Sequence, residues 1–145
     1  MGRIIAIDYG KKRAGIAVTD PLQIIAGGLE TVASCELEKW LENYITGEQV
    51  ECIVVGYPTM LDGSESDTMI RYVKPFINRL KNKFPDLIID MFDERFTSKM
   101  AVSAMLEGGM KKKNRRDKAN IDKISATILL QGYLEQRNRK NVDKI

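Results

Sequence analysis

The chain has 145 residues, of which 43% are hydrophobic and 30% charged, a composition typical of one globular domain with a single core. It contains no histidine, which excludes Ser-His-Asp and Cys-His catalysis and ordinary zinc enzymes. Hydrolytic chemistry would therefore depend on carboxylates, lysine, tyrosine or a metal held by oxygen ligands. Oxygen-only ligation indicates Mg²⁺ or Mn²⁺.

Targeting and redox signals are few. No apolar stretch approaches the ~18 residues needed to span a bilayer. The sequence opens directly into an apolar run instead of a signal peptide, so we predict a cytoplasmic protein with no membrane partner. Two cysteines, Cys35 and Cys52, are too few for a disulfide framework, and we expect both to be reduced thiols.

Charge is distributed unevenly along the chain. Residues 1–70 carry 5 Lys and Arg against 11 Asp and Glu, whereas residues 108–145 carry 11 against 4. A basic end on a protein of net charge +3 favours binding of a polyanion such as a nucleic acid. A solvated basic tail without a partner would give the same pattern.

The first third of the chain predicts three strands. An apolar run, Arg3–Asp8, reads as a strand buried on both faces, and a second follows at Arg13–Thr19. Gly10 suits the turn between them because it accepts positive φ. The segment Leu22–Val32 predicts a third strand with a bulge or an edge position. Strands so close in sequence must pair antiparallel.

Helices and strands then alternate. A helical pattern starts at Ser34 or Cys35 and ends at Gly47, with Trp40 expected as a core contact, and Glu51–Gly56 predicts a central parallel strand. The next helix is expected from Ser64 or Ser66 to about Asn82, with a kink or a later start at Pro75. Its predicted buried face consists of Ile70, Val73, Ile77 and Leu80.

The last third begins with a strand, Leu87–Phe92, in which Asp90 is the one interruption, and continues into Asp93 and Glu94. A helix capped by Thr97 or Ser98 is expected to end at Gly108. The segment Met110–Lys118 predicts a basic loop. A final helix is expected over about Asn120–Arg137. Its predicted buried face consists of Ile121, Ile124, Ile128, Leu129 and Leu134.

These elements predict an α/β fold with a mixed five-stranded sheet, made of a three-stranded antiparallel meander and two parallel strands and flanked by helices. We expect one domain over residues 1–138 and a polar C-terminal tail over 139–145. In this topology Asp8, Asp93 or Glu94, and Asp122 could converge at one edge of the sheet. Adjacent residues on a strand point to opposite faces, so only one of Asp93 and Glu94 can serve.

Three carboxylates held ~4–6 Å apart repel one another unless a cation neutralises them. Two Mg²⁺ ions would do so while clamping a phosphodiester for hydrolysis, and no histidine is needed. Locally, Asp8 could instead support its turn, and Asp122 could simply complement the dipole of its helix.

Four motifs in order carry a family resemblance: Asp8–Gly15, then Gly56-Tyr57-Pro58 with Asp62-Gly63-Ser64, then Asp93–Ser98, then Asp122 with Ser125-Ala126. Together they resemble the YqgF family of Holliday-junction-resolvase-like proteins with a ribonuclease-H-like fold. The resemblance implies a metal-dependent nuclease that matures the 5′ end of precursor 16S ribosomal RNA.

By position, the resemblance implies that Asp8, Glu94 and Asp122 are the catalytic and metal-binding acids. It also implies that Arg13 and Arg95 orient acids or phosphate. The basic loop would grip the phosphates of structured RNA through Lys111, Lys112, Lys113, Arg115 and Arg116.

Three alternatives remain at this point. The same chemistry on branched, four-way DNA would require two active sites and hence a homodimer, whereas an RNA enzyme could be a monomer. A nucleic-acid-binding module without catalysis would explain the basic end equally well. The strand-Asp-x-Gly hairpin also resembles the phosphate loop of sugar kinases and actin-like ATPases. Those proteins bind nucleotide in a cleft between two such domains, whereas 145 residues supply only one.

Overall fold

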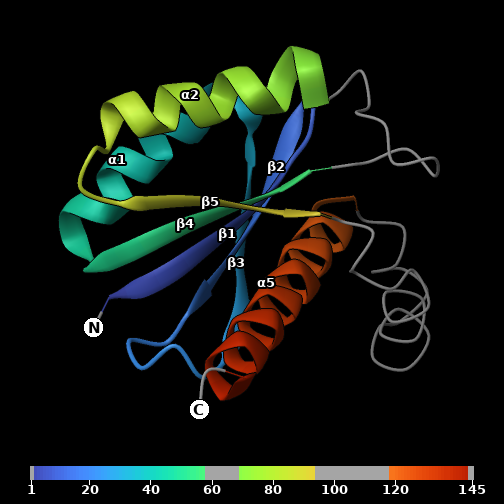
Figure 1. Cartoon of the computed structure of the whole chain (residues 1–145). Helices are drawn as coiled ribbons and strands as arrows, with labels where there is room; N and C mark the ends of the chain where they lie inside the picture. The colour runs from blue at the N-terminus through green and yellow to red at the C-terminus, as the bar shows by residue number, and fades with distance from the viewer. Residues whose placement is uncertain (1, 58–68, 94–117, 144–145) are drawn as a thin grey trace.

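The computed structural model describes residues 2–57, 69–93 and 118–143, with the side chains of the last segment described over 124–138 (Figure 1). The strands are β1 (Arg3–Tyr9), β2 (Arg13–Thr19), β3 (Ala26–Ala33), β4 (Val50–Tyr57) and β5 (Ile88–Asp93). The helices are η1 (Ser34–Glu36), α1 (Leu37–Gly47), η2 (Met69–Val73), α2 (Lys74–Lys83) and α5 (Lys118–Asp143).

All five strands form one mixed sheet in the order β3-β2-β1-β4-β5. β1 pairs antiparallel with β2, which pairs antiparallel with β3, whereas β4 is parallel to both β1 and β5. The predicted meander, the central position of β1 and the two parallel strands are therefore confirmed. β3 lies at an edge, and its pairing with β2 shifts register between Ile16 and Ala17, as the expected bulge requires.

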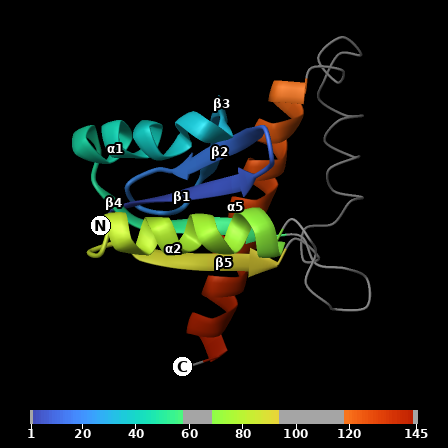
Figure 2. The same ribbon diagram turned by 90° about the horizontal axis from the view of Figure 1, so that it is seen from above.

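Helices cover both faces of the sheet: α1 and α2 lie on one side and α5 on the other (Figures 1 and 2). Alternation along β1 matches this arrangement. Ile5 and Ile7 belong to the core beneath α1 and α2, and Ile4 and Ala6 belong to the core beneath α5. Burial on both faces explains why the middle of each strand, residues 4–7 of β1 and 52–55 of β4, is apolar throughout.

β3 begins at Ala26, later than the predicted Leu22. The carboxylate of Asp20 accepts hydrogen bonds from the backbone N–H groups of Ile24 and Ile25, both at 2.8 Å. Gln23 has a positive φ of 61° in the same turn. The residues between Asp20 and Ala26 are thus held in a turn, which apolar alternation alone did not reveal.

The sequence predicted either a kink at Pro75 or a later start of its helix, and the structure shows the later start. α2 begins at Lys74 and places Pro75 in its first turn, where the missing N–H is tolerated. The preceding five residues form a single π-helical turn, which changes the helical phase. As a result Met69 is buried, whereas Ile70, predicted on the buried face, is 54% exposed.

α5 continues past the predicted end at Arg137 to Asp143. Ile128, Leu129 and Leu134 are buried as predicted, and Leu130 and Tyr133 join them. Ala126 is fully buried against the sheet, where its small side chain allows the helix to approach closely. Within the described segments, no helix combines the length and apolar character needed to span a membrane.

Candidate nuclease site

Asp8 lies near the carboxyl end of β1, at the edge of the sheet where β4 and β5 also end. Its side chain alternates with Ile7 and therefore belongs to the face covered by α5. Asp8 is half-buried, whereas Ile4 to Ile7 before it are fully buried. The carboxylate thus marks the point where the strand leaves the core.

Glycines flank Asp8 on both neighbouring strands. Gly15 of β2 and Gly56 of β4 are its register partners, and neither carries a side chain. The row continues outward to Thr31 on β3 and Phe92 on β5. A carboxylate between two glycines has no neighbouring side chain in its own row to cover it. The sequence does contain a glycine within each of these two apolar strands. Only the pairing of β1 with β2 and β4 shows that both glycines lie beside Asp8.

The turn after Asp8 is tight. The N–H of Gly10 donates to the carbonyl of Arg13 at 3.0 Å, and Ser34 Oγ donates to the carbonyl of Gly10 at 2.7 Å. A Cβ on residue 10 would lie 2.7 Å from the Arg13 carbonyl oxygen. Gly10 is outside the left-handed region, so close approach and not positive φ is the reason for glycine here.

Three cationic side chains lie at the tip of this turn. Lys11, Lys12 and Arg13 are exposed at its tip, and the Lys11 ammonium lies 5.5 Å from the centroid of the Tyr72 ring. The turn therefore presents positive charge at the edge of the sheet that carries Asp8. Arg13, predicted to bind nucleic acid, is placed here at the first residue of β2.

Asp93 ends β5 but does not share the face of Asp8. Its register partner is Tyr57, which packs against the core beneath α1 and α2. The preceding residue, Phe92, belongs to the core beneath α5. Asp93 is only 6% exposed. Of the two adjacent acids, Asp93 is therefore directed away from the Asp8 face.

Asp122 lies in the first part of α5. Figures 1 and 2 both place the start of this helix on the side of the sheet where β1, β4 and β5 end. The side chain of Asp122 lies outside the described residues, as do Glu94 and Arg95. The same holds for the basic loop residues Lys111, Lys112, Lys113, Arg115 and Arg116. Among the side chains that are described, no three acids, cysteines or histidines gather as a metal site.

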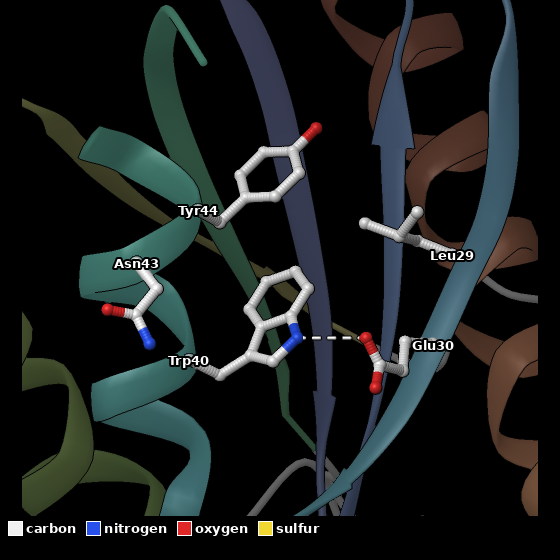
Figure 3. A pocket seen from close by; sticks show the side chains of 5 residues that line it. All are labelled: Leu29, Glu30, Trp40, Asn43 and Tyr44. Atoms are coloured by element: carbon white, nitrogen blue, oxygen red, sulfur yellow. Dashed lines mark hydrogen bonds between the residues drawn. The ribbon is translucent and has the colours of Figure 1, made fainter. Parts of the chain in front are cut away.

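A cavity of about 360 Å³ lies elsewhere, between α1 and β3 (Figure 3). Its lining residues are Leu29, Glu30, Trp40, Asn43 and Tyr44. Trp40 stacks on Tyr44 with ring centroids 5.1 Å apart, and its indole N–H donates to Glu30 at 2.9 Å. Glu30 pairs with Ile16, on the face opposite to Asp8. Trp40 packs against the core as predicted, and this cavity is separate from the Asp8 edge.

Comparison with known proteins gives a consistent result. The model of the family described as "RuvX: Holliday junction resolvase" matches residues 2–136. A Phocaeicola vulgatus protein named "Putative pre-16S rRNA nuclease" is 54% identical over 94% of this chain and 98% of its own length. A Bacteroides fragilis protein of the same name is 50% identical over 94% of this chain and 99% of its own length.

Proposed function

Because this chain belongs to the RuvX family, we propose that it is a nuclease that processes the 5′ end of precursor 16S ribosomal RNA in the cytoplasm. The observation that carries the proposal is the 54% identity, over nearly the full length of both chains, to a relative named for that activity. The position of Asp8 supports it, since a rigid strand holds this carboxylate at the open edge of the sheet.

For the catalytic centre we propose Asp8, Glu94 and Asp122 as ligands of Mg²⁺ or Mn²⁺. The donor set fits such ions, because carboxylate oxygens are their preferred ligands and the chain has no histidine. When bound, a pair of divalent cations supplies charge stabilisation for in-line displacement at phosphorus. Glu94 is preferred over Asp93 because Asp93 is buried on the other face of the sheet.

The chain's own cations would hold the substrate. Arg13 at the first residue of β2, with Arg95 and the basic loop at Lys111, Lys112, Lys113, Arg115 and Arg116, would bind the phosphates of structured RNA. Each phosphate contact lowers the logarithm of affinity by about 0.7–0.9 per decade of salt. RNA binding should therefore weaken steeply as the salt concentration rises.

The test is Asp8→Asn, which keeps the shape of the side chain and removes its charge. We expect cleavage of precursor 16S RNA in Mg²⁺ to fall by at least about a hundredfold. Asp86→Asn is the matched control, because Asp86 is exposed and precedes β5, at the opposite edge of the sheet. Equal cleavage by the Asp8 variant and the unchanged protein would refute the proposal.

The description of the family favours a second substrate, the four-way DNA junction. Paired nicks in a junction need two active sites, so this activity requires a homodimer, whereas cleavage of RNA does not. Sedimentation with junction DNA distinguishes the two. Metal-dependent cleavage of precursor RNA by a monomer that leaves junctions intact would eliminate the DNA substrate. Salt-sensitive RNA binding without cleavage would reduce the protein to a binding module.

A further inference from the structure

The cavity between α1 and β3 combines two aromatic rings with a carboxylate (Figure 3). Trp40 and Tyr44 of α1 point toward the sheet, whereas Leu29 and Glu30 of β3 point toward the helix. The two rings are stacked, with an angle of 8° between their planes. A volume of about 360 Å³ is near the lower end of the range for small-ligand sites, which gives room for one large side chain.

A bulge in β3 builds one wall of this cavity. Ile16 of β2 pairs with Glu30 and Ala17 pairs with Gly28, so Leu29 is the extra residue between them. Neighbouring residues of a regular strand point to opposite faces, yet Leu29 and Glu30 both line the cavity. The bulge therefore places an apolar side chain that is 41% exposed beside an exposed carboxylate.

The carboxylate of Glu30 is held in place but not neutralised. Its Oε2 accepts a hydrogen bond of 2.9 Å from the indole N–H of Trp40. Within the part of the chain that the structure describes, Glu30 has no ion-pair partner, and its Oε1 receives no hydrogen bond. One carboxylate oxygen beside the aromatic rings is thus open to a donor from outside.

The surroundings of the cavity are acidic. Residues 26–48, from the start of β3 to just beyond α1, contain five glutamates against one cation, Lys39. Three of the glutamates pair with cations of other elements: Glu38 with Arg79, Glu42 with Lys83, and Glu48 with Arg3. Glu30 is not among them, so the cavity keeps a net negative charge.

This combination suits a cationic occupant. Aromatic faces attract cations, most strongly at tryptophan, and a nearby carboxylate adds a charge-assisted hydrogen bond. Arginine fits better than lysine, because its planar guanidinium stacks on aromatic rings and its apolar stem can pack against a side chain such as Leu29. The phosphates of RNA would be repelled by the same carboxylate.

The position of the cavity at an edge of the sheet favours a peptide over a free amino acid. β3 pairs with β2 alone among the described strands, so its other edge can receive an extended segment of a second chain. Glu30 shares the face of Ile16, which is opposite to the face of Asp8. A segment bound here would leave the Asp8 face open.

We propose that this cavity is a docking site for an arginine side chain carried on a basic, extended segment of a partner protein. The guanidinium stacks against the rings of Trp40 and Tyr44 and donates to Oε1 of Glu30. The amide of Asn43 lines the same cavity and offers a further acceptor. This inference goes beyond the proposed nuclease activity and does not depend on it.

The first experiment titrates the protein with a hexa-arginine peptide at about 0.15 M salt, which screens long-range attraction. The fluorescence of Trp40, the single tryptophan of the chain, reports on the cavity directly. We expect a saturable change with hexa-arginine, a several-fold weaker response to hexa-lysine, and a much weaker one to N-acetylarginine amide. A fragment of precursor RNA should leave the signal unchanged.

The second experiment measures binding of hexa-arginine by calorimetry in variants. Glu30→Gln keeps an oxygen that accepts the indole N–H and removes the charge, and it should weaken binding about fivefold. Asn43→Asp adds a charge to the lining and should strengthen binding about twofold to fivefold. Glu135→Gln is the matched control, because Glu135 is exposed on α5, on the other side of the sheet. It should bind as the unchanged protein does.

Several results would overturn the inference. If Glu135→Gln weakens binding as much as Glu30→Gln, the peptide is attracted by overall charge and not by this cavity. If hexa-arginine leaves Trp40 fluorescence unchanged, the stacked rings serve only to pack α1 on the sheet. A response to RNA instead would make the cavity a site for a nucleic-acid base. Asp8→Asn should bind the peptide normally, so this test and that of the nuclease fail independently.

Discussion

The turn between β1 and β2 gives the sharpest test of how local geometry supports the site. In Gly10→Ala the new Cβ would lie 2.7 Å from the backbone oxygen of Arg13. Carbon and oxygen atoms in ordinary contact are about 3.3–3.6 Å apart, so the turn must open by roughly 0.6 Å or more. A backbone oxygen cannot rotate away as a side chain can. We expect a loss of about 1–3 kcal/mol in the free energy of unfolding.

Urea unfolding followed by the fluorescence of the single tryptophan, Trp40, measures this loss. Gly47→Ala and Gly27→Ala are matched controls, because a Cβ at either position meets nothing within 4 Å. Gly47 ends α1, so alanine there should be neutral or slightly stabilising. If Gly10→Ala is as stable as the two controls, the steric argument for this turn is wrong.

Three further predictions concern other elements. Thr19→Val should cost about 1–3 kcal/mol in urea, because buried Thr19 Oγ1 accepts the N–H of Ile4 at 2.9 Å and valine leaves that donor unpaired. Burial raises the pKa of the Cys52 thiol to about 11, so iodoacetamide at pH 8 should modify exposed Cys35 and spare Cys52. Since the unfolded thiol ionises first, stability should fall as pH rises from about 9 to 11. Asp93→Asn should leave Mn²⁺ affinity unchanged, and a large loss would contradict its assignment to the other face.

Sequence alone could predict the sheet because its strands are short apolar runs bounded by turn residues, and Arg13–Thr19 matches β2 residue for residue. It could not predict the start of β3, because Leu22, Ile24 and Ile25 are apolar, yet the carboxylate of Asp20 holds the backbone N–H groups of Ile24 and Ile25 in a turn. It also misplaced Ile70, since a π-helical turn shifts the phase that a regular helix would keep.

The candidate site was predictable in part for the same reason. Asp8 follows the apolar run of β1 directly, so its place at the edge of the sheet follows from the local pattern. The glycines beside it come from two other strands, and only the register with Gly15 and Gly56 shows that they share its row. Likewise the hydroxyl of Tyr133 on α5 donates a hydrogen bond to the carboxylate of Asp90 on β5. These residues are 43 positions apart, so no local pattern could have predicted the contact.

Alternation decides which acid can share a ligand with Asp8. The register row of Asp8 passes through Gly56 to Phe92, and these residues face α5. The next row passes through Tyr57 to Asp93 and faces the core beneath α1 and α2. A ligand held by Asp8 is therefore separated from Asp93 by the backbone of the sheet itself. Of the two adjacent acids, this argues against Asp93 and leaves Glu94, which lies outside the described residues, as the one we propose for the metal site.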